Sequence, residues 1–261
     1  MKWIVALSAV LVGMTALAVF LKQSQPLPDP EPSLINPSPL DLSPYGQGDF
    51  AFNKDGYLTC LVGNSIPGID VSYHQGPIDW AEVKASGISF AMIRIGYRGY
   101  DSGTIHVDEL AEENLKGAKA AGLKVGAYFF SQAVTMEEAV EEARFALKLL
   151  AGQKLDMPLA YDWEYVSDTA RTGNVTSQTL MECIRAFCGE VERAGYESLV
   201  YFNQDLFYNK LDLTQLPGDA LWLAMYKDQM AFPYKVRFWQ YSDEGTVPGI
   251  EGNVDLNLYF P

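Results

Sequence analysis

The chain has 261 residues and a formal net charge of −14 at pH 7, because 33 Asp and Glu outnumber 19 Lys and Arg. A chain this acidic binds nucleic-acid phosphates poorly, so we expect no nucleic-acid partner. Two His and three Cys are too few for a Cys/His zinc cluster or a disulfide-stapled scaffold, and we expect neither a metal nor another cofactor.

The N-terminal segment, residues 1–22, is expected to direct export, and a buried core helix is the less favoured interpretation. Residues 3–21 contain no charged side chain, and this length suits a membrane-spanning helix better than the shorter apolar region of a signal peptide. Residues 16–18 nevertheless have the small-residue spacing of a cleavage site. The segment is therefore either an uncleaved membrane anchor or a signal peptide. In both cases we expect the rest of the chain to be exported, held at the membrane or secreted.

Two short segments precede the main domain. Residues 23–48 are expected to form a linker, because seven prolines between positions 26 and 44 favour extended polyproline II over a packed core. Residues 49–65 predict a hairpin, because Asp55 and Gly56 lie between short apolar runs. The remaining residues, 66–261, are expected to form a single domain.

Eight short apolar runs in this domain predict buried strands. They are Ile69–Ser72, Ile88–Tyr97, Lys124–Gln132, Pro158–Glu164, Ser198–Asn203, Leu221–Tyr226, Val236–Tyr241 and Asn253–Asn257. Helical patterns separate the early runs, and this alternation predicts a parallel sheet. The last connections are too short for regular helices. We therefore predict the α/β class, with an irregular, TIM-like β/α barrel.

Two helical patterns can be described more closely. Thr135 and Glu138 have the spacing of a capping box, and an apolar stripe follows from Met136 to Leu150. The glutamates at positions 137, 138, 141 and 142 lie largely off that stripe, which predicts a solvent-exposed face. Cys183 and Cys188 lie on a second stripe, too far apart for a disulfide, and are expected to be core residues.

Four carboxyl groups, Asp70, Asp162, Glu164 and Asp255, fall on three of the predicted strands. In a parallel barrel the active site lies at the C-terminal ends of the strands. Asp162 and Glu164 are two residues apart, so both side chains point to one face of their strand. Two acids held close together in a partly dry site do not both ionise easily, and one can donate a proton while the other stays an anion. Cleavage of a glycosidic bond requires such a pair.

Aromatic side chains near the strand ends favour the same chemistry, because a carbohydrate cleft needs flat apolar faces with polar tips. His74, beside the first strand end, is expected to line the cleft as well. The candidate substrate-binding residues are Tyr73, His74, Tyr128, Tyr161, Tyr201, Tyr226 and Trp239. No Gly-rich phosphate loop and no Gly-x-Ser-x-Gly elbow is present.

The segment Gly68–Trp80, with the sequence GIDVSYHQGPIDW, resembles the opening signature of glycoside hydrolase family 25. This family comprises the Chalaropsis-type lysozymes, or N-acetylmuramidases. Later segments resemble further strand motifs of the family in the same order. They are Gly126–Phe130, Tyr161–Glu164, Leu221–Tyr226, Phe238–Ser242 and Asn253–Asn257. The resemblance therefore runs through the whole expected domain.

This resemblance implies a modified β/α barrel that hydrolyses the β-1,4 bond between N-acetylmuramic acid and N-acetylglucosamine in peptidoglycan. By position, Glu164 is the proton donor and Asp162 the second catalytic carboxylate. Two mechanisms stay open, since Asp162 either attacks the sugar as a nucleophile or orients the substrate's own acetamido group. Asp70 and Asp255 are implied as supporting acids, and Tyr128 and Gln240 as substrate contacts. We expect a monomer whose partner is the glycan strand of the cell wall.

Phe129 departs from the family, which often has His at this position. The change affects packing if Phe129 faces outward, and removes a polar substrate contact if it faces the cleft. Two other functions stay open: a non-catalytic peptidoglycan-binding barrel, and a glycosidase for another N-acetylated glycan. Retention of all four acids argues against a pure binding module.

Overall fold

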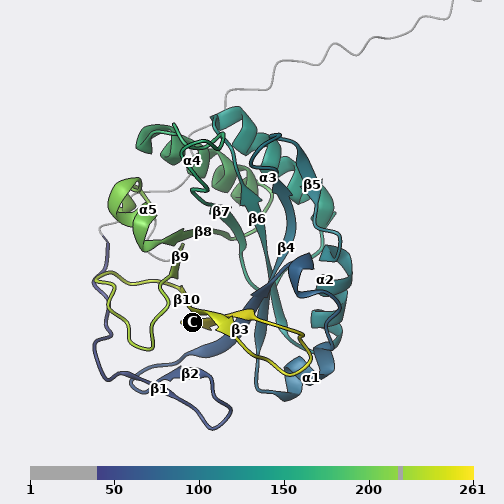
Figure 1. The fold of residues 1–261 in the computed structure, drawn as a ribbon, viewed down its shortest axis with the longest axis vertical. Helices are drawn as coiled ribbons and strands as arrows, with labels where there is room; N and C mark the ends of the chain where they lie inside the picture. The colour runs from purple at the N-terminus through teal and green to yellow at the C-terminus, as the bar shows by residue number, and fades with distance from the viewer. Residues whose placement is uncertain (1–39, 217–219) are drawn as a thin grey trace, which may run out of the picture.

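The computed structural model describes residues 40–216 and 220–261, and its centre is a closed barrel of eight strands (Figure 1). The barrel strands are β3 (Ile66–Val71), β4 (Phe90–Arg98), β6 (Lys124–Ser131), β7 (Leu159–Trp163), β8 (Ser198–Asn203), β9 (Leu221–Ala224), β10 (Phe238–Gly245) and β11 (Val254–Tyr259). Pairing between β3 and β4 closes the ring. The predicted irregular β/α barrel is confirmed.

One strand departs from the predicted parallel arrangement. Neighbours from β3 through to β10 pair in parallel, but β11 is antiparallel to both β10 and β3. A parallel neighbour needs a crossover of a dozen or more residues. Only residues 246–253 connect β10 to β11, so the chain reverses direction instead.

Helices cover one side of the barrel. They are α1 (Trp80–Ala85), α2 (Ala111–Ala120), α3 (Met136–Leu150), α4 (Ser177–Arg193) and α5 (Gln204–Asn209), with 3-10 turns η1 (Tyr73–Gln75) and η2 (Leu213–Gln215). Helices α2, α3 and α4 pack on β4, β6, β7 and β8 (Figure 1). Thr135 caps α3 by accepting from the Glu138 amide, and the apolar stripe behind it faces the barrel.

The expected solvent-exposed face of α3 is wrong at Glu142, which is fully buried. Arg98 from β4 donates to its carboxylate at 2.6 Å, and the Ser131 hydroxyl donates at 2.5 Å. A sequence pattern for α3 alone cannot show a cation supplied by a neighbouring strand, which is what makes burial of a carboxylate tolerable.

A hairpin takes the place of a covering helix beside β10. Strands β1 (Phe50–Phe52) and β2 (Leu58–Cys60) pair antiparallel within the segment predicted as a hairpin. The Phe50 ring packs on Trp239 of β10 with 5.1 Å between centroids, and the Leu58 amide donates to the Tyr241 hydroxyl. Residues 225–237 and 246–253 form no helix, so this hairpin shields β10 from water. Strand β5 (Ile105–Val107) extends the sheet beside β4.

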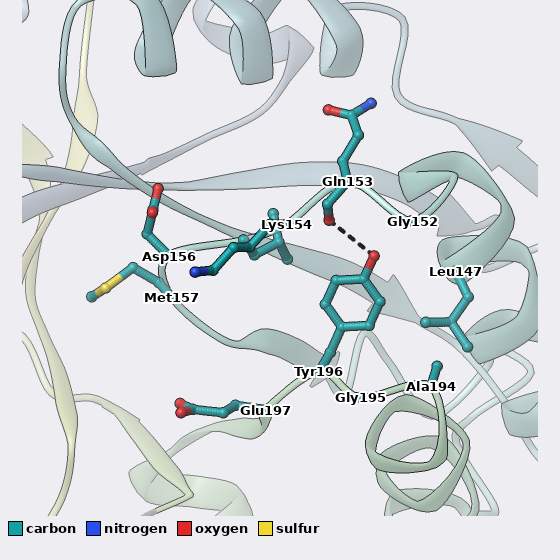
Figure 2. Close-up of a pocket in the computed structure, with 11 residues that line it drawn as sticks. Leu147, Gly152, Gln153, Lys154, Asp156, Met157, Ala194, Gly195, Tyr196 and Glu197 are labelled. Atoms are coloured by element: carbon teal, nitrogen blue, oxygen red, sulfur yellow. Dashed lines mark hydrogen bonds between the residues drawn. The ribbon is translucent and has the colours of Figure 1, made fainter.

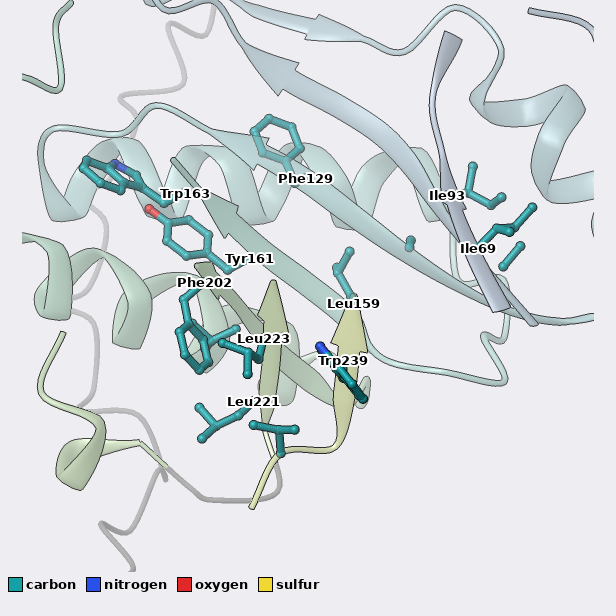
Figure 3. Packing of buried hydrophobic residues seen from close by; sticks show 14 of the residues in the cluster. Ile69, Ile93, Phe129, Leu159, Tyr161, Trp163, Phe202, Leu221, Leu223 and Trp239 are labelled. Carbon is teal, nitrogen blue, oxygen red and sulfur yellow. The ribbon is translucent and has the colours of Figure 1, made fainter. Parts of the chain in front are cut away.

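Side-chain alternation along the strands creates two apolar layers. Phe90, Met92, Trp222 and Phe238 fill the interior of the barrel, and a second layer lies between the barrel and its covering elements (Figure 3). Phe129 belongs to this outer layer, with its ring 6.4 Å from the rings of Phe145 and Phe187. Its departure from the family therefore affects packing rather than the pocket. Three free cysteines, at positions 60, 183 and 188, are buried.

Within the described residues no helix is both long enough and apolar enough to cross a membrane. The predicted anchor or signal peptide, residues 1–22, lies outside the described part of the chain, as do residues 23–39 of the predicted linker. The described end of that linker lies against the domain, where Leu42 pairs with Tyr234 and the ring of Tyr45 is 4.9 Å from that of Phe260.

Candidate active site

A pocket of about 230 Å³ opens at the C-terminal ends of the parallel barrel strands. Its walls bring together four carboxyl groups, one guanidinium group and several aromatic rings. The lining residues are Asp70, Ser72, His74, Gln75, Arg94, Tyr128, Phe130, Asp162, Glu164, Tyr201, Trp222, Tyr226, Gln240 and Asp255. All four predicted acids, and most of the predicted substrate-binding residues, therefore meet at one site.

The reversed strand β11 is what brings Asp255 to this pocket. Asp255 is the second residue of β11, near the start of the strand. Because β11 is antiparallel, its beginning lies beside the C-terminal end of β3, and Asp255 is paired in register with Asp70. A parallel last strand would have carried Asp255 to the opposite end of the barrel.

Asp162 and Glu164 extend from the end of β7 into the pocket, while Trp163 between them is buried on the opposite face. Burial raises the pKa of Asp162 well above its usual range, and the neighbouring charge of Glu164 raises this pKa further. Burial also raises the pKa of Glu164. The pair therefore holds a proton at pH values where an isolated carboxyl group has lost it. Glu164 is half-buried and Asp162 fully buried, so Glu164 is the more accessible of the two.

Asp70 and Asp255 form a second pair of acids. Asp70 Oδ2 accepts from Gln240 Nε2 at 2.8 Å and from Asn257 Nδ2 at 2.7 Å, which orients the carboxyl group. Burial raises the pKa of Asp70 in spite of these hydrogen bonds. Burial and the charge of Asp70 raise the pKa of Asp255 to about 9.

A hydrogen-bonded wall stands behind these acids. The hydroxyl groups of Tyr201 and Tyr226 donate to Gln240 Oε1 at 3.0 and 3.2 Å. Trp222 Nε1 donates to Asn257 Oδ1 at 2.9 Å. With its amide oxygen occupied, Gln240 must turn its NH₂ group toward Asp70, so the wall sets the orientation of that acid.

Arg94 is the cation in the pocket, and the sequence analysis missed it. Its Nε donates to the fully buried Asp108 at 2.9 Å, and its guanidinium group lies over the rings of Tyr73 and Tyr97. Its charge counteracts the rise in the pKa of Asp162. Arg94 is the one charged residue inside the predicted run Ile88–Tyr97, and this was the available signal, since such a charge is buried only with a partner or a function.

Two of the predicted substrate contacts are wrong, and a third is indirect. Tyr161 is fully buried on the helix side of β7, where its hydroxyl pairs with Ser131 and its ring packs on Phe187. Trp239 is also fully buried, and its Nε1 donates to the Met225 carbonyl. Both precede an inward-facing residue, so strand alternation turns them away from the pocket. Tyr73 is not on the pocket wall, but its ring lies against the guanidinium group of Arg94, which lines the pocket.

Four further lining residues were missed: Ser72, Gln75, Phe130 and Trp222. Phe130 and Trp222 each lie two positions from an inward-facing residue of the same strand, so alternation could have identified them. Ser72 and Gln75 hold each other in the turn η1, where Gln75 Oε1 accepts from the Ser72 amide. That local cap carried no sign of a functional role in the sequence.

A larger hollow of about 510 Å³ lies at the other end of the barrel (Figure 2). It is lined by the turns that lead into β7 and β8, and the Tyr196 hydroxyl donates across it to the Gln153 carbonyl at 2.9 Å. In β/α barrels this N-terminal face serves stability, whereas catalytic groups gather at the opposite face. The smaller pocket, with its strand-end acids, is therefore the candidate active site. No three His, Cys, Asp or Glu side chains in the described residues are arranged to hold a metal ion.

A closed β/α barrel with paired acids and aromatic rings at its C-terminal mouth is the arrangement of a glycoside hydrolase. Comparison with known proteins names the family. The chain belongs to glycosyl hydrolases family 25, because the sequence profile of that family matches residues 69–250. This confirms the family indicated by the sequence motifs.

Individual relatives agree with this assignment. The chain is 31% identical over 199 residues to an autolytic lysozyme of Clostridium acetobutylicum, a match covering 74% of this chain and 56% of the relative. It resembles the structure of the modular autolysin LytC from Streptococcus pneumoniae, with a TM-score of 0.68 and 24% identity over 85% of this chain and 52% of that chain. The structure of a family 25 glycosyl hydrolase from Bacillus anthracis matches with a TM-score of 0.62 and 23% identity. This match covers 75% of this chain and 89% of that chain. The chain thus spans about half the length of the first two proteins.

Proposed function

We propose that this protein is a lysozyme of the N-acetylmuramidase type, which hydrolyses the β-1,4 bond between N-acetylmuramic acid and N-acetylglucosamine in bacterial peptidoglycan. The observation that carries the proposal is the Asp162 and Glu164 pair at the barrel mouth, where both acids share one buried pocket. Membership of family 25 and the similarity to an autolytic lysozyme support the substrate class.

In the proposed reaction, Glu164 protonates the glycosidic oxygen as the bond breaks. Its half-buried position lets it reach a bound glycan, and burial raises its pKa, which favours the protonated form that a donor needs. As the leaving sugar departs, positive charge develops at the anomeric carbon, and the proposed role of Asp162 is to stabilise this charge.

Asp162 acts by orienting the substrate's acetamido group, whose carbonyl oxygen then attacks the anomeric carbon. Asp162 lines the pocket, and its Oδ1 atom has no hydrogen-bond partner among the described residues, so the carboxylate has acceptor capacity left for an acetamido N–H. Burial and the neighbouring acids oppose the ionised form of Asp162 that this role requires by raising its pKa, and the charge of Arg94 counteracts them. Asp70 and Asp255 line the same pocket as supporting acids, and Tyr128, Tyr201, Tyr226 and Gln240 are the proposed sugar contacts.

Substitution of Glu164 by Gln tests the proposal. We expect residues 40–261 to release disaccharide-peptides with reducing muramic acid ends from purified peptidoglycan, and Glu164→Gln to release none while keeping its fold and wall binding. The products are identified by reduction and mass analysis, and binding by co-sedimentation with the wall. Glu109→Gln, a change at an exposed acid, serves as the control.

Each contrary outcome points to a different error. Activity of Glu164→Gln within a few-fold of the unmodified chain would refute the assigned proton donor. Wall binding without any products from either protein would favour the binding module. Cleavage of chitin but not of peptidoglycan would favour a glycosidase for another N-acetylated glycan.

We also propose that the chain acts outside the cytoplasm, held at the membrane by residues 1–22 and facing the cell wall. The uncharged stretch 3–21 and the Pro-rich residues 23–39 support this location, since together they suit an anchor followed by a spacer. The proposed enzyme acts as a monomer, because one chain contains all four acids of the pocket.

A further inference from the structure

Gln132, a fully buried residue directly after β6, lies behind the pocket wall and does not line the pocket. Its Nε2 donates to the backbone carbonyl of Glu164 at 2.8 Å and to that of Ser131 at 3.0 Å. Its Oε1 accepts from the Thr172 hydroxyl at 3.2 Å. One amide group therefore ties the end of β6 to Glu164 and to the loop that follows it.

This tie lies where regular strand pairing has ended. The register between β6 and β7 stops at the pair Ser131 and Trp163, one residue before Glu164. The indole of Trp163 donates to the Ala133 carbonyl at 3.0 Å, which fixes the last residue of β7. Earlier in the sheet, a neighbouring strand donates hydrogen bonds to the backbone carbonyls of β7. At Glu164 the side chain of Gln132 donates that hydrogen bond instead.

The loop after Glu164 is held from the same side. Arg171 donates to the backbone carbonyl of Gln132 and makes two hydrogen bonds of 2.6 and 3.0 Å to the Glu138 carboxylate. Glu138 also accepts from the Val134 amide at 2.8 Å. The turn between β6 and α3 and the loop between β7 and α4 thus form one connected unit, with the amide of Gln132 at its centre.

We propose that Gln132 is a positioning residue for the proton donor Glu164, an inference that rests on the proposed function. Its hydrogen bond sets the backbone of Glu164, and that backbone sets where the carboxyl group meets the glycosidic oxygen. Displacement of a catalytic group by about 1 Å can cost on the order of 100-fold in rate. Gln132 does not line the pocket, so we expect its loss to act on proton donation and not on binding.

Two substrates that differ in their need for a proton provide the test. Cleavage of peptidoglycan expels a sugar alkoxide that must be protonated, whereas a 2,4-dinitrophenyl β-glycoside of N-acetylmuramic acid expels a stable phenolate that needs no proton. For Gln132→Leu, we expect kcat on peptidoglycan to fall at least about 10-fold, with KM changed less than about two-fold. The rate on the dinitrophenyl glycoside should fall less than about three-fold, because general acid catalysis contributes little there.

Thr172→Val is the matched control. It removes the partner of Gln132 Oε1, but Nε2 keeps its hydrogen bonds to the Ser131 and Glu164 carbonyls, which hold the amide in its orientation. Both rates should therefore stay near those of the unmodified chain. Gln132→Met, whose side chain is unbranched like that of Gln, repeats the test if the Leu variant does not fold.

Equal losses on both substrates, an unchanged rate on peptidoglycan, or misfolding of both Gln132 variants would overturn the inference and leave Gln132 a structural residue. An unmodified chain that binds peptidoglycan without cleaving it would instead refute the proposed function, and this inference with it.

Discussion

At the scale of single residues, the pocket brings together four acids, and the folded structure disfavours the ionised form of each one. Asp70, Asp162, Glu164 and Asp255 are all partly or fully removed from water, and burial raises the pKa of each one. One guanidinium group, that of Arg94, opposes this charge inside the pocket. Such a cluster is costly for stability, and functional sites commonly carry such costs.

Asp255 makes this cost measurable. Its pKa of about 9 in the folded chain exceeds its ordinary value of 3.8, so the folded state binds this proton more tightly than the unfolded state. Proton binding by Asp255 therefore stabilises the folded state fully below about pH 4, and this stabilisation is lost as pH rises toward 9. We therefore expect the unfolding temperature of the unmodified chain to fall between pH 5 and pH 9. Asp255→Asn, which cannot ionise, should show a shallower decline.

Thermal unfolding followed by circular dichroism checks this prediction. Asp101→Asn, which changes an exposed acid outside the pocket, should keep the slope of the unmodified chain. Identical slopes for the unmodified chain and Asp255→Asn would show that Asp255 does not hold its proton in the folded state.

At the scale of elements, close approach between β3 and β4 depends on a glycine. Gly68 is in register with Phe90, and a Cβ atom at position 68 would lie 2.2–2.4 Å from three atoms of the Phe90 ring. That ring is held in the barrel interior against Phe238 and Tyr259, so it cannot move aside freely. The strand pair that closes the barrel therefore has no room for a side chain here.

Gly68→Ala should destabilise the barrel by about 2 kcal/mol, a usual cost of overpacking a core. For a domain of this size that corresponds to a drop of roughly 4–8 °C in Tm. Gly46→Ala is the control, because a Cβ atom there meets only one atom at 3.9 Å. Adding Phe90→Leu to Gly68→Ala should restore part of the loss. An unchanged Tm for Gly68→Ala would contradict the packing seen between β3 and β4.

At the scale of the whole molecule, the net charge of the chain affects how it would approach the cell wall, and so does the proposed membrane anchor. The chain carries a net charge of −14, and an anionic enzyme gains no long-range attraction toward an anionic wall. Tethering at the membrane would keep the domain near the wall without electrostatic attraction, because a linked domain stays at high local concentration near its substrate.

Fractionation of bacteria that express the full chain tests the tether. We expect the protein in the membrane fraction, released by detergent but not by salt, because a spanning helix is held by its apolar surface. Removal of residues 1–22 should leave the protein in the soluble fraction. A chain recovered from the medium with its N-terminus cut near residue 18 would identify a signal peptide instead.

Much of the architecture followed from local patterns. Apolar runs of strand length, helical stripes and short final connections predict an irregular barrel, because each reports how one segment buries its own side chains. The two-residue spacing of Asp162 and Glu164 likewise predicts one shared face of one strand. Tyr161 and Trp239 lie outside the pocket even so, because alternation along a strand, and not proximity to its end, decides which face a side chain occupies.

The sequence by itself determined the family, the barrel and the acids at its mouth, since all of these depend on short-range patterns and ordered motifs. Tertiary structure alone decided the reversal of β11 that sets Asp255 beside Asp70, the pairing of Arg94 with Asp108, and the reach of Gln132 to Glu164. Each of these joins residues from different segments of the chain, and the contact distances that create them exist only once the barrel has closed.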